Sequence, residues 1–296
     1  MKILNYGSLN IDKVFSVDHI VRPGETIHST NIELFAGGKG ANQSVALSRA
    51  GLDVWHAGKI GEDGRWLLKI LGDAGVRTEN ISVYDGSTGH AYIQLDLDGN
   101  NSIILEGGGN QCISRAEIDH TLSLFSSGDY LVLQNEINDV PYIMERSRGR
   151  GMKICLNPAP IEREVKDWPL DLVDIMILNE IEAKTLCGIE GEYEEVLDSL
   201  VKRYPYAEIV MTVGPDGSYC GCGQSGLFLH VPVSEKSGPV VDTTAAGDTY
   251  LGYYLASRIA GLPVKESMER ASFAAAITVS RKGAMETIPD HTALFH

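Results

Sequence analysis

Short apolar stretches alternate along most of the chain with segments in which apolar residues recur at helical spacing. The apolar stretches predict strands at residues 2–6, 53–60, 130–134, 152–156, 175–178 and 208–213. The intervening segments predict helices that open at residues 37–43 and cover about 64–71, 118–125, 196–204, 245–260 and 264–280. Ser114 with Glu117 forms a capping-box pattern before residues 118–125, and Asn179, with Glu182 three residues later, predicts a further helix cap. This strand–helix alternation is typical of a parallel sheet with helices on both faces. We therefore expect a single α/β domain over residues 1–296.

Four strand-like stretches break the alternation, because no helix lies between the members of each pair. They lie at residues 14–17, 27–35, 90–96 and 102–105. Turn residues separate the members of each pair, Arg22-Pro23-Gly24-Glu25 in the first and Asp98-Gly99-Asn100 in the second. We expect two hairpins that form a small separate sheet over about residues 13–36 and 89–106. One face of this sheet would be free to cover a site or a second subunit.

Composition and charge narrow the class of protein. The chain has 296 residues, 43% of them hydrophobic, which is enough for one large α/β domain with a small appendage. Its formal net charge of −15 disfavours non-specific binding to nucleic acid or to an anionic membrane surface. No apolar run reaches membrane-spanning length, and the N-terminal MKILNYG predicts a strand and not a signal peptide.

The cysteines point to a reducing compartment. Five cysteines form an odd set with no framework spacing, so reduced thiols in a cytoplasmic protein are the simplest account. Cys220 and Cys222 could begin a metal site, but no nearby pair of cysteines or histidines completes one.

The segment VVDTTAAGDTYLG at residues 240–252 predicts a loop that becomes a helix at Ala245, Ala246 and Gly247. The start of a helix offers backbone N–H groups without intrahelical partners and the positive end of the helix dipole. Small side chains let an anion approach these groups, and Asp248 would stand beside it. This arrangement suits phosphoryl transfer, since the N–H groups stabilise the phosphoryl charge and the carboxylate takes the proton of the attacking hydroxyl. The alternative is an ordinary aspartate in a first helical turn.

Other polar candidates lie at predicted strand ends or helix starts. They are Asn10, Asp12, Gly38, Asn42 and Glu136. Polyhydroxy substrates need such hydrogen-bonding groups, because a buried hydroxyl without a partner is costly. Each residue alone could equally be a cap or turn residue.

The familiar nucleotide motifs are absent or misplaced. The stretch GGKGAN lacks the spacing of a Walker A loop. Gly221-x-Gly223-x-x-Gly226 has the dinucleotide spacing, but it lies inside a predicted hairpin without a following helix, so we reject it.

Taken together, residues 37–43 (GGKGANQ) and 242–249 (DTTAAGDT) resemble the two signatures of the ribokinase-like sugar kinases, the PfkB family. Supporting stretches are GSLNID at 7–12, Pro23-Gly24-Glu25, Asn179-x-x-Glu182 and RKGA at 281–284. The resemblance covers nearly the whole chain. It implies a doubly wound α/β fold with a small β-sheet lid and ATP-dependent phosphorylation of a sugar's primary hydroxyl. Within this family, the residues GGKGANQ favour D-ribose as the substrate, which would be converted to ribose 5-phosphate. Fructose or a nucleoside is the alternative substrate, and a catalytically silent sugar- or nucleotide-binding protein is a third interpretation.

The resemblance also implies a role for each matching residue. Asp248 is implied to be the catalytic base, with the backbone of Ala245, Ala246 and Gly247 as the anion hole. The residues implied to hold the sugar are Asn10, Asp12, Gly38, Asn42, Glu136 and Asp248, with Ala91 and Ile93 of the lid over its apolar face. Those implied to serve ATP and Mg²⁺ are Asn179, Glu182, Thr212 and Gly214.

A monovalent-cation site for K⁺ is implied as well. Its residues are Asp242, Thr244, Thr278, Arg281, Gly283 and Thr287, with Thr278, Arg281 and Gly283 acting through carbonyl oxygens. The alternative is that Asp242 only caps its turn, with Arg281 or Lys282 as a counter-charge.

The lid is implied to form a homodimer contact, for which Val14, Phe15, Ile32, Leu34, Tyr92 and Leu95 offer apolar surface. The sequence departs from the family pattern at Asn135, at residues 107–110, and at His90 and Tyr92 beside the lid contact. These departures leave the identity of the sugar open.

Overall fold

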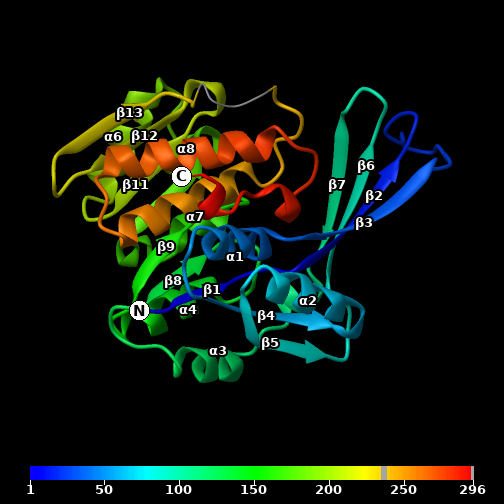
Figure 1. Cartoon of the computed structure of the whole chain (residues 1–296), viewed down its shortest axis with the longest axis horizontal. Coiled ribbons are helices and arrows are strands. Elements are labelled where there is room, and N and C mark those ends of the chain that lie inside the picture. Colours follow the sequence, from blue (N-terminus) through cyan, green and yellow to red (C-terminus); the bar gives the residue numbers. More distant parts are fainter. Residues whose placement is uncertain (235–238, 295–296) are drawn as a thin grey trace.

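The computed structural model describes residues 1–234 and 239–294, and a nine-stranded sheet forms the centre of this part of the chain (Figure 1). The strand order is β13-β12-β11-β10-β9-β8-β1-β4-β5. The strands from β11 to β5 run parallel, whereas β12 and β13 form an antiparallel hairpin beside β11. The strands are β1 (Ile3–Tyr6), β4 (Val54–Gly61), β5 (Arg77–Tyr84), β8 (Tyr130–Leu133), β9 (Lys153–Leu156), β10 (Ile175–Asn179), β11 (Glu208–Thr212), β12 (Ser218–Cys222) and β13 (Leu227–Val231).

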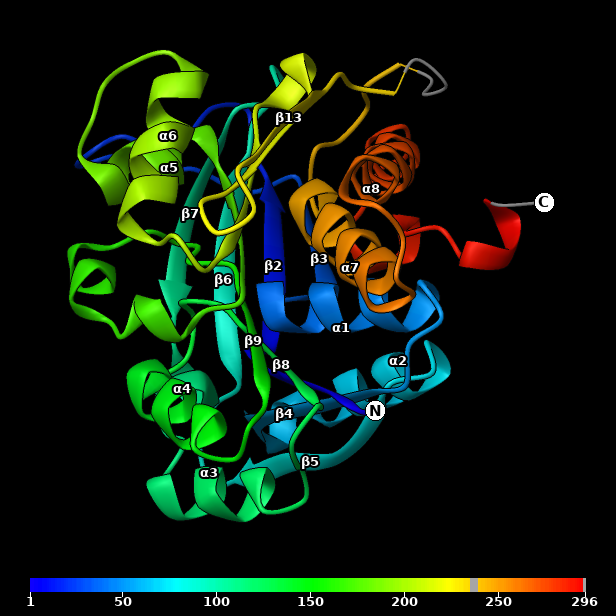
Figure 2. The ribbon, with the colours of Figure 1, turned by 90° about the vertical axis from the view of Figure 1, so that its left-hand side faces the viewer.

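Helices cover both faces of this sheet, as Figure 2 shows. The helices α3, α4, α5 and α6 pack on one face, and α1, α2, α7 and α8 pack on the other. Neighbouring strand residues point to opposite faces, so Leu4 joins the first core and Ile3 the second. The helices are α1 (Lys39–Arg49), α2 (Arg65–Asp73), α3 (Arg115–Leu122), α4 (Val140–Arg148), α5 (Glu180–Cys187), α6 (Tyr193–Arg203), α7 (Ala246–Ile259) and α8 (Val264–Val279). The predicted doubly wound α/β fold is confirmed.

The order of the strands changes direction at β1. After β1 the chain adds β4 and β5 on one side, and it later adds β8 to β13 on the other. In open α/β sheets, ligands bind at the carboxyl ends of the strands beside such a switch point. The carboxyl ends of β1 and β8 lead directly into residues 7–9 and 134–136. Of the predicted site residues, Glu136 lies in the second of these segments and Asn10 follows the first.

A separate four-stranded sheet, which we call the lid, projects from the main sheet (Figure 1). Its strands, in the order β3-β2-β6-β7, are β3 (Asn31–Gly37), β2 (Asn10–Ser16), β6 (Gly89–Leu95) and β7 (Asn101–Glu106). The two predicted hairpins are antiparallel, and they join through a parallel pairing of β2 with β6. The register places Asp12 beside Ala91 on one face and Lys13 beside Tyr92 on the other. The predicted small sheet is thus confirmed.

Three elements differ from the sequence prediction. The strand predicted at residues 27–35 is displaced to Asn31–Gly37, because polar residues after the Pro-Gly turn extend the loop. The strand β5 was not predicted, since RTENISVY lies at the edge of the sheet and is polar over half its length. The helix α4 was also missed, since its nine residues carry a proline at the second position and end in a charged stretch.

Two negative predictions can also be compared with the structure. The segment from Gly221 to Gly226 lies in the β12–β13 hairpin, which confirms the rejection of a dinucleotide motif there. Within residues 1–234 and 239–294, no helix is both long and apolar enough to cross a membrane.

Candidate active site

The loop before α7 turns into the helix at the predicted position. α7 begins at Ala246, and Ala245 has a left-handed backbone conformation with φ of 60°. This conformation is uncommon for alanine, and such strained residues cluster at functional sites. The N–H of Ala246 donates over a long 3.3 Å to the carbonyl of Thr243, and a Cβ atom built on Gly247 would meet no other atom within 4 Å. The start of α7 is therefore sterically open, and an anion can approach its N–H groups.

Asp248 lies in the first turn of α7 and is buried, with 7% of its surface exposed. Its Oδ2 accepts a hydrogen bond from Nδ2 of Asn42 at 3.1 Å, and its Oδ1 accepts one from Nε2 of Gln43 at 2.9 Å. Both donors belong to α1, so the beginnings of α1 and α7 meet at this carboxylate. The Oδ1 of Asn42 is buried and has no hydrogen-bond partner among the described residues. It can accept a hydrogen bond from a ligand hydroxyl next to Asp248.

Two further carboxylates lie near the start of α1. Glu136 follows β8, and its Oε2 accepts hydrogen bonds from the hydroxyl of Ser8 and from the backbone N–H of Lys39, the latter at 3.0 Å. Burial raises the pKa of Glu136. Burial and the charge of Glu136 together raise the pKa of Asp12 to about 7. A carboxyl group whose pKa is raised by burial and by a neighbouring carboxylate is typical of a polar binding site.

Lys39 supplies positive charge among these carboxylates. Burial would lower the pKa of Lys39, but the charges of Asp248, Glu136 and Glu182 raise it. Three carboxylates that come from α7, from the loop after β8 and from α5 thus share one ammonium group. The ammonium group of Lys39 therefore lies where it could also stabilise the negative charge of a transferred group.

The remaining predicted sugar residues line the base of the lid. Asn10 is buried, and its Oδ1 accepts a hydrogen bond from Nδ2 of Asn110 at 2.7 Å. Gly38 has φ of 94°, and a Cβ atom there would lie 3.0 Å from the backbone N of Asn10, so only glycine fits without strain. Ala91 and Ile93 share the lid face of Asp12. The structure thus places all five predicted polar residues and both lid residues around one region.

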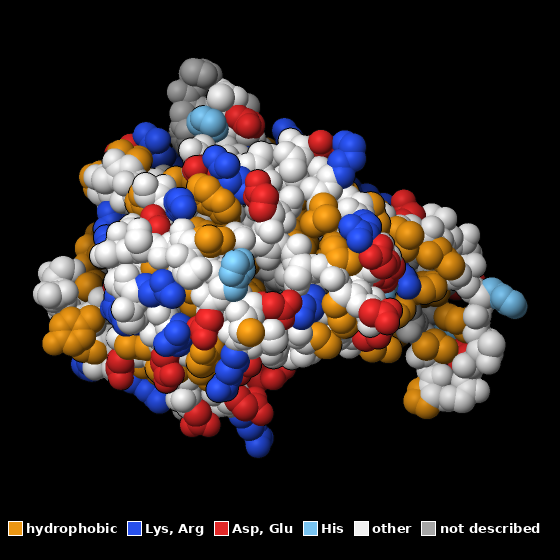
Figure 3. Space-filling model, turned by 90° about the horizontal axis from the view of Figure 1, so that it is seen from below, with side chains coloured by type: hydrophobic (Ala, Val, Ile, Leu, Met, Phe, Trp, Pro, Cys, Tyr) orange, Lys and Arg blue, Asp and Glu red, His pale blue; other side chains and the backbone are white. Residues whose placement is uncertain are grey.

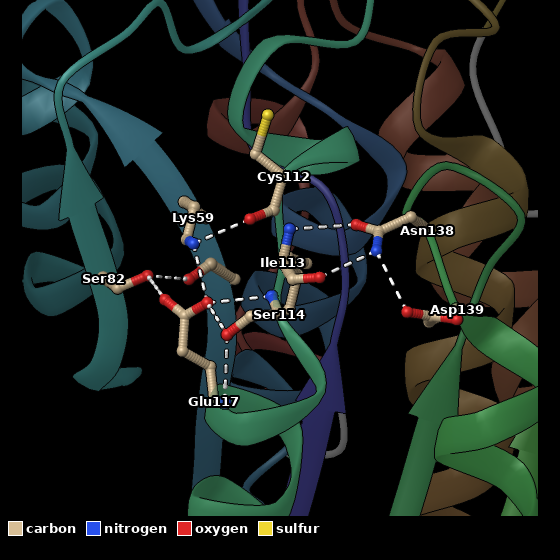
Figure 4. A network of polar contacts seen from close by, with 9 residues as sticks. Lys59, Ser82, Cys112, Ile113, Ser114, Glu117, Asn138 and Asp139 are labelled. Atoms are coloured by element: carbon tan, nitrogen blue, oxygen red, sulfur yellow. Dashed lines mark hydrogen bonds and ion pairs between the residues drawn. The ribbon is translucent and has the colours of Figure 1, made fainter.

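The loop that carries Asn110 is fixed by a network of polar contacts (Figure 4). Nζ of Lys59 donates to the carbonyl of Cys112 and to Oε2 of Glu117, each at 2.7 Å. Glu117 also accepts hydrogen bonds from Ser114 in the capping box of α3 and from Ser82 of β5. The strands β4 and β5 therefore hold the loop that orients Asn10.

The predicted nucleotide residues lie together at the carboxyl ends of β10 and β11. Asn179 caps α5, and it exchanges hydrogen bonds of 2.8 and 2.9 Å with Glu182, which confirms the predicted cap. Thr212 pairs with Asn179 in the sheet register, and Gly214 follows with φ of 56°. Burial raises the pKa of Glu182.

The six predicted cation residues belong to the loop before α7, to the end of α8 and to the segment that follows α8. Oδ1 of Asp242 accepts hydrogen bonds from the N–H and hydroxyl of Thr244 at 2.9 and 2.7 Å, and its Oδ2 accepts one from the N–H of Gly283 at 3.1 Å. Although burial opposes it, these bonds and the charge of Lys282 lower the pKa of Asp242. The backbone N–H of Arg281 donates to the carbonyl of Thr278. The remaining residue, Thr287, donates its hydroxyl to the carbonyl of Ala284.

Asp242 therefore caps its turn in this structure, as the alternative interpretation expects. Among the described residues, no group of three histidine, cysteine, aspartate or glutamate side chains could hold a metal ion. A monovalent-cation site made mostly of carbonyl and hydroxyl oxygens would not contain such a group of side chains.

Comparison with known proteins identifies the family. A family model described as "pfkB family carbohydrate kinase" matches residues 1–291. The chain belongs to the pfkB family. A ribokinase of Haemophilus influenzae is 34% identical over 96% of this chain and 94% of its own length. A bifunctional ribokinase/ribose-5-phosphate isomerase A of Fructilactobacillus sanfranciscensis is also 34% identical, but the chain spans only 56% of that protein's length.

A solved pfkB-type structure has the same architecture. The Arabidopsis thaliana ribokinase complexed with ribose and ATP superposes with a TM-score of 0.85 at 29% identity, covering 99% of this chain and 96% of that one. The predicted resemblance to ribokinase-like kinases and the predicted enzyme class, a phosphotransferase acting on an alcohol group, are confirmed.

Sequence reasoning missed several polar residues beneath the pfkB site. They are Asn5, Ser8, Lys39, Gln43, Asn110, Gln134 and Asn157. Lys39 and Gln43 stand inside the signature GGKGANQ, which was the available signal. Ser8 stands in the supporting stretch GSLNID. The other four belong to strands or loops without a motif, and only their packing brings them together.

Among the departures from the family pattern, residues 107–110 reach the sugar site, because Asn110 donates to Asn10, whereas the others lie away from the sugar face. His90 and Tyr92 alternate with Ala91 along β6, so they point to the opposite face of the lid. Nδ2 of Asn135 donates to the carbonyl of Pro160 at 2.7 Å, which gives Asn135 a structural contact.

Proposed function

We propose that the chain transfers the γ-phosphoryl group of ATP to the primary hydroxyl of D-ribose and forms ribose 5-phosphate. The observation that carries this proposal is the buried carboxylate of Asp248 in the first turn of α7, hydrogen-bonded to Asn42 of the sugar set. In this role Asp248 accepts the proton of the attacking hydroxyl. The N–H groups of Ala245, Ala246 and Gly247 stabilise the charge of the transferred group. The names of the similar proteins support ribose and ATP as the reactants.

The sugar is held by polar groups at its hydroxyls and by apolar groups over its ring. Asn10, Asp12, Asn42 and Glu136 supply donors and acceptors at the base of the lid, and Gly38 leaves room beside Asn10. Ala91 and Ile93 cover the apolar face. The unpartnered Oδ1 of Asn42 supports this assignment, because a ligand hydroxyl would satisfy it.

ATP would lie along Thr212 and Gly214, with its phosphates toward the start of α7. Asn179 and Glu182 would organise the phosphates and Mg²⁺ through water, since Mg²⁺ prefers oxygen ligands and keeps several waters. When bound, Mg²⁺ would neutralise the charge of the phosphate oxygens. Burial raises the pKa of Glu182, so a cation bound with the nucleotide would stabilise its ionised form.

The donor set near Asp242 fits a monovalent cation such as K⁺. Thr244 and Thr287 donate their hydroxyl hydrogens to Asp242 and to a carbonyl, which leaves oxygen lone pairs free. These oxygens, with the carboxylate of Asp242 and the carbonyl oxygens of Thr278, Arg281 and Gly283, make an all-oxygen set of the kind that suits weakly hydrated cations. Such a cation would stabilise the loop that forms the anion hole.

A homodimer through the lid and a cytoplasmic location complete the proposal. Exposed apolar side chains on the lid support the first, and five free cysteines among the described residues support the second.

An ADP-release assay over pentoses, hexoses and nucleosides tests this function. We expect ribose to rank among the best substrates by kcat/KM. A clear preference for fructose or for a nucleoside would replace the substrate but keep the reaction. Saturable sugar binding without ADP release for any sugar would instead support a silent binding protein.

A further inference from the structure

Gln43 lies beneath the proposed site with every polar atom in use. It is fully buried in the first turn of α1. Its Nε2 donates to Oδ1 of Asp248 at 2.9 Å and to Oδ1 of Asn157 at 3.2 Å, and its Oε1 accepts from Nε2 of Gln134 at 2.6 Å. A buried amide that satisfies both hydrogens and its oxygen has one orientation.

The neighbours of Gln43 fix that orientation from two sides. Nδ2 of Asn157 donates to the carbonyl of Ile177 at 2.9 Å, so the oxygen of Asn157 must face Gln43. Nε2 of Gln134 also donates to Oδ1 of Asn5 at 3.0 Å. Nδ2 of Asn5 in turn donates to the carbonyl of Gly40 at 2.8 Å. Backbone carbonyls only accept, so both ends of this chain of amides force the nitrogen of Gln43 toward Asp248.

The two oxygens of Asp248 are consequently not equivalent. Oδ1 is bound by the fixed amide of Gln43, whereas Oδ2 is bound by Asn42, whose own oxygen still lacks a partner. When a sugar hydroxyl satisfies Asn42, Oδ2 remains the oxygen that can take a proton.

We propose that Gln43 is the positioning residue of the reaction: it binds Oδ1 of Asp248, fixes the orientation of the carboxylate and presents Oδ2 to the primary hydroxyl of the substrate. This inference rests on the proposed kinase function and adds how its base is oriented. Gln43 itself touches no reacting atom.

The charged groups around Asp248 act differently from Gln43. Lys39 of α1, Glu136 of the loop after β8 and Glu182 of α5 all face this region. In the part of the chain that the structure describes, none of them hydrogen-bonds to the Asp248 carboxylate. The amides of Asn42 and Gln43 contact the carboxylate directly, and of these two Gln43 is the one that binds Oδ1.

The first test replaces Gln43 by an apolar side chain of similar length. Gln43→Met removes the donor to Oδ1, so the ionised carboxylate is less stable and less well oriented. We expect kcat at neutral pH to fall on the order of tenfold, with the KM values of ribose and ATP changed less than about threefold. The ratio of variant to wild-type kcat should rise with pH, because the variant lacks the donor that favours the carboxylate form over the carboxylic acid.

The second variant reverses the pH trend. Gln43→Glu keeps the volume and, when protonated, can still donate to Oδ1. As the pH rises, the new carboxyl loses its proton and repels Asp248. The ratio of its kcat to that of the wild type should therefore fall with pH. A residue that only fills space would give a pH-independent ratio in both variants.

A double variant and a matched control complete the experiment. If Gln43 acts through Asp248, adding Gln43→Met to Asp248→Asn should cost almost nothing further in kcat. Ser267→Ala, in the first turn of α8, removes the hydroxyl that donates to the carbonyl of Pro263 at 3.0 Å. This control should leave the pH profile unchanged. Ratios that do not vary with pH, or additive losses in the double variant, overturn the role of Gln43. A wild-type chain that releases no ADP with any sugar overturns the proposed function as well. If Gln43→Met does not fold, the Gln43→Glu profile decides alone.

Discussion

Asp248 combines burial with two amide donors, which hold its carboxylate in one orientation. The base role is tested by Asp248→Asn, which keeps the shape of the side chain but cannot accept the proton. We expect kcat to fall about 10²–10⁴-fold, while the sugar and ATP still bind. Asp73→Asn, at an exposed aspartate paired with Lys69, is the matched control and should keep full activity. A variant that retains more than roughly a third of wild-type kcat, with chemistry rate-limiting, would remove Asp248 from the role of base.

Glu136 serves binding more than chemistry, because it lies beside Asp12 and Ser8 and not at the start of α7. Truncation by Glu136→Ala should therefore act on the sugar. We expect the KM of ribose to rise roughly tenfold or more, as for loss of a charged hydrogen-bond partner, and the KM of ATP to change little. Initial rates over a range of ribose concentrations measure this, and an unchanged KM for ribose would exclude Glu136 from the sugar site.

At the scale of single residues, the sequence identified groups with a motif and missed groups without one. The signature GGKGANQ led to Gly38 and Asn42, and the helix start led to Asp248. Gln43 and Asp248 are 205 positions apart, and nothing in either motif states that their side chains meet. Such pairing follows from the packing of α1 against α7, which is a property of the assembled core.

The contact between Lys59 and Glu117 joins three elements, β4, β5 and α3, and gives a prediction about acid stability. Although burial opposes it, hydrogen bonds from Lys59, Ser114 and Ser82 lower the pKa of Glu117 to about 2. A glutamate in the unfolded chain has a pKa of about 4.3. The folded state therefore favours the ionised form, and this stabilisation is complete above about pH 4.3 and is lost as the pH falls toward 2.

Glu117→Gln should remove this contribution. We expect the variant to be less stable than the wild type at pH 6, and the difference in the free energy of unfolding to shrink steadily below about pH 4.3. Denaturant unfolding at several pH values measures this. Glu195→Gln, at an exposed carboxylate of α6, is the control and should show no such trend. A difference that stays constant down to pH 3 would show that the contact does not depend on the charge of Glu117.

The loop from Asp242 to Thr244 and the end of α8 form the element on which a monovalent cation would act. Since such an ion would order the anion hole without touching the sugar, it should change kcat more than the KM of ribose. Replacing a bulky organic cation by K⁺ at fixed ionic strength should raise kcat severalfold, on the order of 1 kcal/mol in the barrier. Equal rates with both cations would exclude an activating site.

The residue Asp290 offers a matched control for the cation experiment. It accepts hydrogen bonds from the N–H and hydroxyl of Thr292 at 2.9 and 2.6 Å, much as Asp242 does from Thr244. Asp242→Ala should abolish the response to K⁺, and Asp290→Ala should preserve it. Full activation of the Asp242→Ala variant would leave Asp242 as a turn cap only.

At the scale of elements, buried strands and capped helices were predictable because burial and capping impose local patterns. Asn179 with Glu182 and Ser114 with Glu117 are examples, since both form the expected capping boxes. The edge strand β5 and the short helix α4 lack such patterns. The parallel pairing of β2 with β6 was also beyond local signals, because it joins hairpins that are separated by α1, β4, α2 and β5.

For the whole molecule, the register of the lid changes which residues can form a dimer contact. The six apolar residues predicted from the sequence divide between the two faces. Val14 and Leu95 share the face of Asp12, whereas Phe15, Ile32, Leu34 and Tyr92 lie on the other. On this outer face, Leu34, Lys13, Tyr92 and Ile104 form one cross-strand row, and its ends Leu34 and Ile104 are 59% and 64% exposed.

Apolar side chains also gather on the surface at the right-hand end of Figure 3, the end at which Figure 1 shows the lid. A small sheet of this kind is marginally stable in water unless an apolar face is packed, and exposed apolar patches usually mark an interface. We therefore expect the wild type to be a dimer through the lid. The double variant Leu34→Glu/Ile104→Glu should be a monomer in sedimentation experiments at micromolar concentration. Ile181→Glu, at an apolar residue of α5 that is 66% exposed, is the control and should remain dimeric. A wild type that sediments as a monomer would contradict the interface, and a double variant that stays dimeric would place it elsewhere.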